Sequence, residues 1–280
     1  MGTTGTLRCL VYGDPNSHVE FSTPEGSAII REVKRVFGSK VVIELADSAS
    51  VQNGRAFDSK PHIFILPGIF GETSHYPEHI GLRGNANIRE FVSQGGVFMG
   101  FCAGAYYAAE TILYQPKWGE TKIREKDNLS IISAQAFGPL PGYCEPIAEE
   151  RARFPEGWHR VDPIPVVICE NNRRIEMAYG YGPAFKLAAG SANDVNVIAR
   201  YADIEGTPPA IIEGKFGRGR VMLYGALPQF SHEQDPSHIG NSVPPSLKRL
   251  LQSLYDNRDA RAEFWDGQMA RVAKYCGMAL

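Results

Sequence analysis

The feature that most constrains the fold of this chain is a cysteine between two glycines, because it stands where an apolar strand is expected to meet a helix. The segment Gly100-Phe101-Cys102-Ala103-Gly104 follows an apolar run at 97–99 and opens an Ala-rich stretch at 103–113 without Gly or Pro after Gly104. The apolar run at 97–99 predicts a buried strand, and the Ala-rich stretch at 103–113 predicts a helix. Gly-x-nucleophile-x-Gly in that setting is typical of a nucleophile elbow, whose sharp turn tolerates only small neighbours. The alternative is a buried structural cysteine in a tight turn.

Such an elbow would shape the chemistry of Cys102. A thiolate is favoured at the positive end of a helix, so we expect the pKa of Cys102 to be lowered. The amide of Ala103 would point to where an oxyanion forms. A second loop, Pro67-Gly68-Ile69-Phe70-Gly71, comes directly after a strand expected at 62–66. Gly68 and Ile69 can offer a further backbone amide there, although a plain strand-to-loop turn explains the loop equally well.

A cysteine nucleophile also needs a base, usually His, and an acid that orients it. The loop after the strand expected at 220–224 holds His232 beside Glu233, and His232 is therefore the candidate base. A solvated loop histidine is the alternative. Asp14, at the end of the first strand, and Tyr106 are the candidate substrate-binding residues, although an Asp before Pro is also ordinary turn chemistry.

No metal or cofactor site is expected from the sequence. His75 and His79 have the i, i+4 spacing of a metal pair, but Pro77 lies between them and no further ligand is obvious. The Gly217-Arg218-Gly219-Arg220 string has no helix after it, so a hairpin turn explains it better than phosphate binding. Five cysteines without a C-x-x-C pair argue against both a disulfide framework and a zinc ribbon.

Short apolar runs alternate with helical patterns in the first hundred residues. We expect strands at 7–12, 40–45, 62–66 and 97–99, with helices at 27–37 and 85–93 and a turn-like segment at 46–60. This alternation predicts βαβ units and a parallel sheet. Further strands are expected at 129–134, 166–169, 175–179, 195–201, 210–215 and 220–224.

The chain is expected to form a single domain over 1–280. Its core spans about 7–235, with an antiparallel elaboration between 114 and 165 and a helical C-terminal extension at about 244–280. Apolar stripes at helical spacing in that extension predict faces packed on the core. Leu247, Leu250, Leu251 and Leu254 form the first stripe, and Phe264, Trp265, Met269 and Val272 the second.

The composition is ordinary, and this excludes several classes of protein. Of 280 residues, 43% are hydrophobic and 21% charged, with a net charge of -2. No charge excess points to nucleic acid or an anionic membrane, and the apolar runs are too short to span a bilayer. The N-terminus lacks the basic and apolar regions of a secretory signal. We therefore expect a cytoplasmic, reduced protein with a small-molecule ligand or substrate, and we leave a protein partner open.

Several stretches together carry a family resemblance. They are Pro67-Gly68, the segment 83–92, and above all Gly100-Phe101-Cys102-Ala103-Gly104-Ala105-Tyr106-Tyr107, and they continue through Tyr179-Gly180-Tyr181-Gly182-Pro183 and 217–225. Over roughly 7–235 the chain resembles the class I glutamine amidotransferase-like region at the N-terminus of eukaryotic biotin–protein ligases. The resemblance implies a three-layer α/β/α, flavodoxin-like and mostly parallel fold. It also implies that Cys102 is the nucleophile and that the Pro67-Gly68 loop is the oxyanion loop.

The chain departs from the family pattern where the catalytic base should stand. The pattern Gly-x-His-Pro-Glu is here Gly225-Ala226-Leu227-Pro228-Gln229, so Leu227 replaces the base and Gln229 its acidic partner. Ile69 also replaces a second glycine of the oxyanion loop. Only the helical segment 244–280 follows the matched region, so we do not expect a biotin ligase.

These observations leave three hypotheses. In the first, Cys102 attacks a small amide or acyl carbonyl, the amides of Ala103 and Ile69 hold the oxyanion, and His232 is a substitute base. In the second, the chain is a non-catalytic ligand-binding or regulatory domain, a pseudoenzyme that keeps the elbow for its shape. In the third, Cys102 is a redox-sensing thiol.

Overall fold

The structure of the protein is a computed structural model in which part of the chain is described. The described residues are 5–13, 28–68, 76–115, 121–124, 126–140, 143, 166–169, 172–188, 190, 194–230 and 245–278. Asp14, Ile69 and His232 lie outside them.

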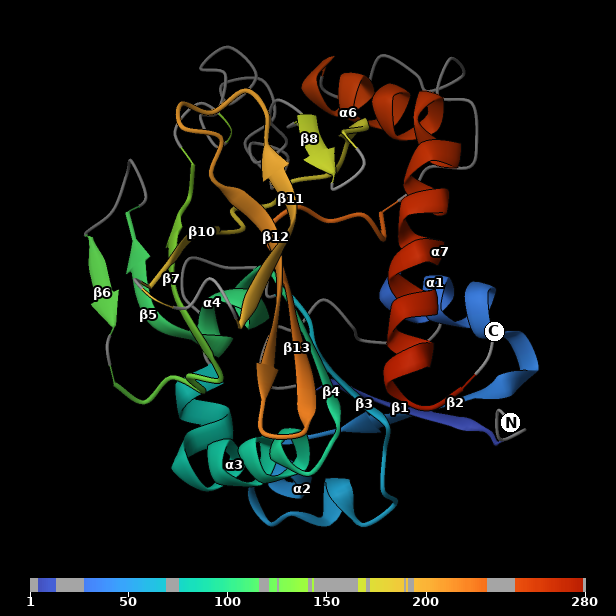
Figure 1. The fold of residues 1–280 in the computed structure, drawn as a ribbon, viewed down its shortest axis with the longest axis vertical. Coiled ribbons are helices and arrows are strands. Elements are labelled where there is room, and N and C mark those ends of the chain that lie inside the picture. The colour runs from blue at the N-terminus through green and yellow to red at the C-terminus, as the bar shows by residue number, and fades with distance from the viewer. Residues whose placement is uncertain are drawn as a thin grey trace.

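The molecule is built on a nine-stranded sheet whose first half is parallel (Figure 1). This half contains β2 (Val41–Ala46), β1 (Leu7–Tyr12), β3 (Ile63–Leu66), β4 (Val97–Phe101) and β13 (Gly219–Tyr224), in that spatial order. The order corresponds to the 2-1-3-4-5 arrangement of flavodoxin-like sheets. The predicted flavodoxin-like, mostly parallel fold is therefore confirmed.

Four antiparallel strands continue the same sheet beyond β13. They are β12 (Pro209–Phe216), β11 (Val195–Tyr201), β8 (Val166–Cys169) and β9 (Arg174–Glu176). β12 and β13 pair from Phe216 opposite Gly219 onward, and Gly217 between them has a φ of 58°. The hairpin expected at the Gly-Arg-Gly-Arg string is thus confirmed. Glycine suits this turn because it adopts the left-handed conformation at little cost.

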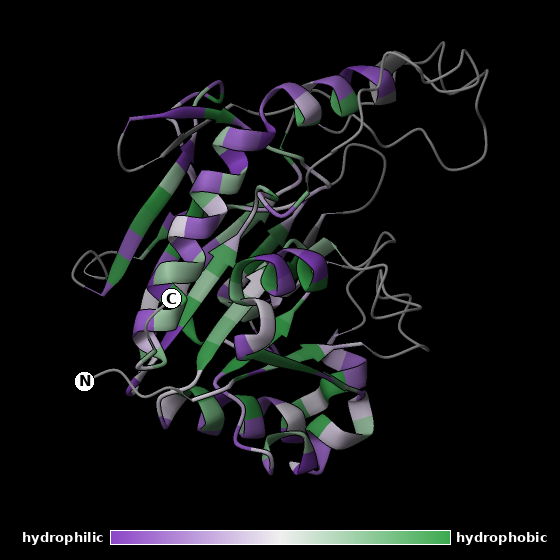
Figure 2. Ribbon diagram, turned by 90° about the vertical axis from the view of Figure 1, so that its right-hand side faces the viewer, coloured by the Kyte–Doolittle hydropathy of each residue, from purple (hydrophilic) through white to green (hydrophobic). Residues whose placement is uncertain are grey.

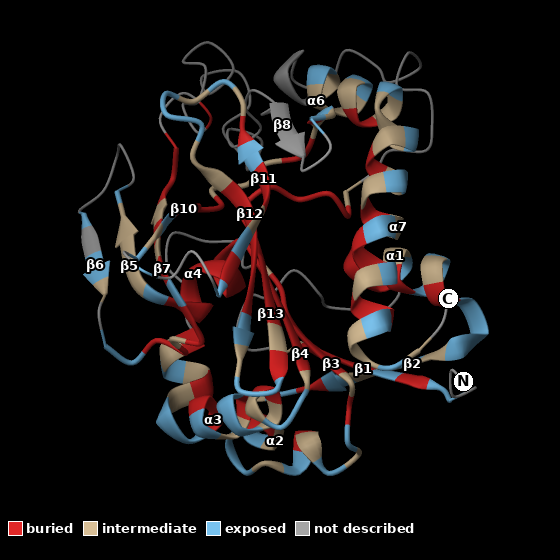
Figure 3. Ribbon diagram, in the orientation of Figure 1, coloured by how far each residue is buried: buried red, intermediate tan, exposed pale blue. Residues whose placement is uncertain are grey.

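Helices cover both faces of the parallel half, which completes the three layers. The helices α1 (Ala28–Phe37) and α7 (Arg258–Tyr275) pack against each other on one side, and α2 (Ser48–Gln52) and α3 (Tyr76–Ser93) lie together on the other (Figure 1). Figure 2 shows the strands between them as mostly hydrophobic, and Figure 3 shows the parallel half of the sheet as mostly buried. Two continuous apolar faces of the sheet explain why these strands carry apolar runs rather than alternation.

A smaller four-stranded sheet lies to one side of the main sheet. Its spatial order is β10 (Ala184–Leu187), β7 (Ile132–Gly138), β5 (Ala109–Tyr114) and β6 (Lys122–Arg124). The helix predicted at 103–113 is wrong in its second half, because α4 (Ala103–Ala108) ends where β5 begins. The residues of β5 after Glu110 are Thr, Ile, Leu and Tyr, and pairing with β7 outweighs the weak local helix preference.

Other differences from the sequence prediction are short elements. Asp47 accepts a hydrogen bond from the Ser50 amide at 2.8 Å, and this cap begins α2 where only turns were expected. The one-turn helices η2 (Gly38–Lys40) and η3 (Arg55–Phe57) were not predicted either. The strand expected at 129–134 lies later, as β7, and β6 and β10 were missed.

The C-terminal helices α6 (Pro245–Asp256) and α7 confirm the predicted helical extension. Trp265, Met269 and Val272 of α7 are fully buried, as their spacing predicted. The Trp265 ring lies 6.1 Å from that of Phe101 and 6.3 Å from that of Tyr224, centroid to centroid. Helix α7 therefore packs directly on the two strands that end beside Cys102.

Candidate active site

Cys102 lies in a sharp turn between β4 and α4, at the carboxyl end of the parallel sheet. Its backbone has φ 47° and ψ -106°, and its amide donates to the Tyr224 carbonyl at 2.9 Å. A Cβ added at Gly104 would lie 2.1 Å from the Leu66 carbonyl oxygen, and one at Gly100 would lie 2.7 Å from the Gly104 carbonyl oxygen. Both glycines are thus required by close backbone approach, which is the packing that the sequence pattern anticipated.

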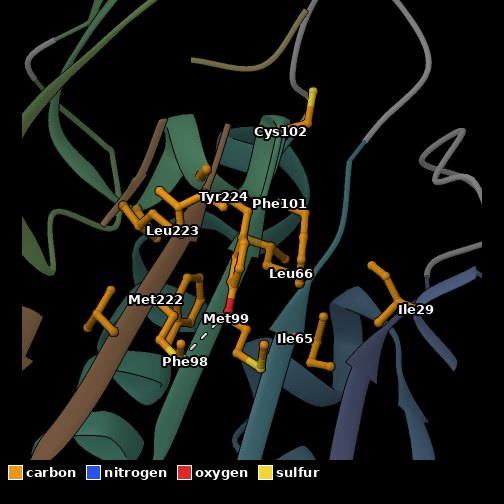
Figure 4. Packing of buried hydrophobic residues seen from close by; sticks show 14 of the residues in the cluster. Ile29, Ile65, Leu66, Phe98, Met99, Phe101, Cys102, Met222, Leu223 and Tyr224 are labelled. Atoms are coloured by element: carbon orange, nitrogen blue, oxygen red, sulfur yellow. Dashed lines mark hydrogen bonds between the residues drawn. The ribbon is translucent and has the colours of Figure 1, made fainter. Parts of the chain in front are cut away.

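Figure 4 shows the Cys102 sulfur beyond the packed side chains of β3, β4 and β13 and pointing away from them. Gly68, the first glycine of the predicted oxyanion loop, lies directly beside it, since a Cβ there would be 3.3 Å from Cys102 Cβ and 3.9 Å from Sγ. Among the described turn and loop hydrogen bonds, none uses the Ala103 amide, as expected for the first residue of a helix. Ala103 is 8% exposed.

A carbonyl oxygen from a distant part of the chain contacts the thiol. Cys102 Sγ donates to the Gly180 carbonyl oxygen at 2.9 Å, across 78 positions of sequence, and Cys102 is only 9% exposed. A carbonyl accepts hydrogen bonds and cannot donate one, so this contact is made by the protonated thiol. Gly180 belongs to a segment, 178–183, which we call the cover segment.

The cover segment is held at several points. The Leu227 amide donates to the Ala178 carbonyl at 2.9 Å, and the Tyr201 hydroxyl donates to the Pro183 carbonyl at 3.2 Å. The Tyr106 hydroxyl donates to the Tyr181 carbonyl at 3.1 Å. These contacts keep the segment over Cys102 at both ends and in the middle.

Leu227 and Gln229, which are predicted to stand where the family has its base and acid, are both buried. Leu227 is 8% exposed, and its Cδ1 would lie 4.0 Å from a Cβ at Gly180, so it stands next to the carbonyl that contacts the thiol. Gln229 is 3% exposed, and among the described residues its Oε1 has no hydrogen-bond partner. An aliphatic side chain can neither accept nor release a proton, so Leu227 contributes only apolar surface.

The structure brings together four of the seven predicted site residues: Cys102, Ala103, Gly68 and Tyr106. Asp14, Ile69 and His232 lie outside the described residues, so their predicted roles stay predictions. Tyr106 is 5% exposed, and its hydroxyl is engaged with the Tyr181 carbonyl.

Sequence reasoning missed the contact of Gly180 with Cys102. The sequence offered a tyrosine between two glycines after a predicted strand, in a stretch that also carries the family resemblance, but neither signal indicates which residue the stretch contacts. Among the described residues, no group of three or more metal-ligating side chains occurs.

Buried tyrosines near the site remain protonated. Burial raises the pKa of Tyr107, whose hydroxyl donates to Asn85 Oδ1 at 2.8 Å. Burial and then the hydrogen bond to Asp203 raise the pKa of Tyr143. These phenols are therefore hydrogen-bonding groups rather than acids at neutral pH.

The fold and the turn at Cys102 define the class: a doubly wound α/β protein with a cysteine at the carboxyl edge of a central strand. The chain belongs to the family described as "Biotin-protein ligase, N terminal", whose model matches residues 9–276. The predicted resemblance is confirmed.

Two curated relatives are similar in sequence. The biotin--protein ligase of Schizosaccharomyces pombe is 27% identical over 192 residues, which are 67% of this chain and 28% of that protein. An uncharacterized protein of Chlamydia muridarum is 27% identical over 218 residues, 72% of this chain and 80% of that protein. The chain thus spans under a third of the yeast ligase and most of the chlamydial protein.

Solved structures are similar at the level of fold. A β-galactosidase from Bacillus circulans sp. alkalophilus matches 98% of this chain and 31% of its own, with a TM-score of 0.51 and 11% identity. A glutamine amidotransferase matches 80% of this chain and 93% of its own, with a TM-score of 0.45 and 19% identity. Within the described part of the chain, no helix has the length and apolar character to cross a bilayer.

Proposed function

We propose that the protein is an amidotransferase-like thiol protein in which Cys102 attacks the carbonyl of a small amide or acyl substrate. The observation that carries this proposal is the backbone of Cys102, with φ 47° and ψ -106°. A non-glycine residue held so costs on the order of 1–3 kcal/mol, and such strain persists where the surrounding structure enforces it. Contacts at Gly68, Gly100 and Gly104 enforce it here, which supports a nucleophile elbow.

The reaction would proceed through a thioester. The Cys102 thiolate adds to the substrate carbonyl carbon, a C–S bond forms, and the bond to the leaving amine or alcohol breaks as that group takes up a proton. Water then hydrolyses the thioester and frees the thiol. The amides of Ala103 and Ile69 are the proposed oxyanion donors, and His232 is the proposed base, since Leu227 cannot serve.

The alternative is a non-catalytic ligand-binding or regulatory domain. Two observations favour it: the apolar side chain of Leu227 lies beside Gly180, and the thiol donates to the Gly180 carbonyl. In that case the strained turn would serve to shape a binding site. Asp14 and Tyr106 are proposed substrate or ligand contacts in either case.

The other proposals concern context. We propose one domain over 1–280 in a reducing, cytoplasmic setting, with a small molecule as ligand. The three cysteines described as free, Cys9, Cys102 and Cys276, are consistent with that setting. Biotin ligation is not proposed for this chain.

A panel of p-nitrophenyl esters and small amides tests the two functions. We expect slow hydrolysis that is lost in Cys102→Ala. Leu227→His should raise the rate by ~10-fold or more, because general-base catalysis contributes typically 10²–10⁴-fold. Leu227→Asn is the matched control, since it adds polarity without a base. If the Cys102→Ala protein hydrolyses the substrates at the wild-type rate, Cys102 is not the nucleophile. If neither the wild type nor Leu227→His hydrolyses any substrate, the result favours the non-catalytic binding domain.

A further inference from the structure

The contact between Cys102 and Gly180 raises the question of how the thiol becomes reactive. Sγ donates to the Gly180 carbonyl oxygen at 2.9 Å, and this holds the proton on the sulfur. A thiolate in the same place would face the negative end of a carbonyl dipole, so forming it here is unfavourable. An active Cys102 therefore needs a different group in front of it.

The backbone of Tyr181 shows where the change can occur. Its φ is 62°, a left-handed conformation that is uncommon and strained for a bulky residue. Gly180 and Tyr181 share one planar peptide group, which carries the Gly180 carbonyl on one side and the Tyr181 amide on the other. Turning this group by half a rotation moves φ of Tyr181 from 62° to about -120°, out of the left-handed range and into the negative φ range that L-residues prefer.

The described hydrogen bonds at the two ends of the cover segment would stay in place during that rotation. Upstream, the Ala178 carbonyl is held by the Leu227 amide at 2.9 Å. Downstream, the Tyr181 carbonyl is held by Tyr106, and a Cβ at Gly182 would lie 2.0 Å from the Gly225 carbonyl oxygen, so that end is tightly packed. Gly180 itself has room, because among the described atoms a Cβ there would meet only Leu227 Cδ1, at 4.0 Å.

We propose that the Gly180–Tyr181 peptide is a two-state switch on Cys102, and that the Tyr181 amide is a latent hydrogen-bond donor of the site. In the closed state seen here, the Gly180 carbonyl accepts from the thiol. In the open state, the Tyr181 N–H faces the sulfur, where it stabilises the thiolate and can donate to the oxygen of a bound carbonyl substrate. A ligand whose carbonyl oxygen accepts from this N–H shifts the equilibrium toward the open state.

The inference rests on the proposed function of Cys102, but its test needs no turnover. The rate of alkylation of Cys102 by iodoacetamide is measured by peptide mass spectrometry in Tyr181→Val, Tyr181→Ala and Tyr181→Gly. All three variants lose the phenol and differ in their tolerance of a left-handed backbone. Glycine tolerates it freely and valine least.

The switch predicts that alkylation is fastest in Tyr181→Val and slowest in Tyr181→Gly. The left-handed penalty of roughly 1–2 kcal/mol corresponds to about a five-fold or larger difference between the alanine and glycine variants. If the segment only covers the thiol, the order reverses, because the smallest and most flexible residue exposes Cys102 most. A reversed order or equal rates would refute the switch.

Two controls separate the switch from other effects. Cys276 is partly buried and distant in sequence, so its alkylation rate should be the same in all three variants. Parallel acceleration at Cys276 would mean general loosening and would count against the switch. The proposed function fails separately, through an inert panel of substrates, and such a failure leaves the order of the alkylation rates unchanged.

Discussion

Arg261 offers the sharpest test of how the C-terminal helices support the site. This side chain of α7 is fully buried and donates to carbonyls of three separate segments. Its Nε donates to the Phe230 carbonyl oxygen at 3.0 Å, and one terminal nitrogen donates to the Glu176 carbonyl oxygen at 3.1 Å. The other terminal nitrogen donates to the Leu254 carbonyl oxygen. Arg261 thus ties the chain after β13, the end of β9 and the end of α6 to α7. We predict that Arg261→Met strongly destabilises the protein.

The magnitude follows from two opposing contributions. Leaving a carbonyl without its partner costs about 2 kcal/mol in each segment, or about 6 kcal/mol for the three segments. Against this, burial lowers the pKa of Arg261 from its ordinary value to about 10, so removing the charge recovers ~3 kcal/mol. The net loss is about 3 kcal/mol. At roughly 2–4 °C per kcal/mol, Tm should fall by about 6–12 °C.

Differential scanning calorimetry and urea unfolding measure this loss. Arg258→Met is the matched control, because Arg258 lies in the same helix, half-exposed, and donates to the Tyr255 carbonyl at 2.9 Å. The control should change stability by less than ~1 kcal/mol. Arg261→Lys should destabilise at least as much as Arg261→Met, because it keeps the buried charge but cannot reach three carbonyls. Equal stability of the Arg261→Met and Arg258→Met proteins would refute the reasoning.

Three further outcomes are expected. Gly104→Ala should cost at least ~3 kcal/mol, because its Cβ would lie 2.1 Å from the Leu66 carbonyl oxygen. Gly267→Ala in α7 should gain ~1 kcal/mol, because its Cβ would lie within 4 Å of no described atom beyond the backbone of its own helix and its chain neighbours. Urea midpoints of these two variants that shift in the same direction would contradict this. Burial and then the Arg8 charge lower the pKa of His62 below its ordinary 6.5, and its Nδ1 accepts from the Arg8 amide. The unfolded chain therefore binds more protons, so this contribution to stability is present above pH 6.5 and is lost as the pH falls through the folded-state pKa. Urea midpoints between pH 7.5 and 5.5 should fall less in His62→Asn than in the wild type, and an equal fall would exclude His62 as the cause.

Local sequence patterns predicted much of the sheet because burial on two faces leaves a plain signal. The strands at Leu7–Tyr12 and Val166–Cys169 have their expected bounds, and the helix Ala28–Phe37 ends at the expected residue. The pattern failed at 109–114, where a strand of the smaller sheet replaced the predicted helix. The local preference was weak there, and pairing with a strand about twenty residues later decided the conformation.

By itself, the sequence determined the parallel α/β core, the turn that presents Cys102, and the family, because these depend on apolar runs and on glycines at fixed spacing. Only the tertiary structure decided what stands in front of the thiol. The Gly180 carbonyl lies 78 positions from Cys102 along the chain, and Leu227 reaches the same place from the end of β13. Such neighbours are set by the packing of remote segments. A periodic pattern records whether a residue is buried, but not which residue it meets.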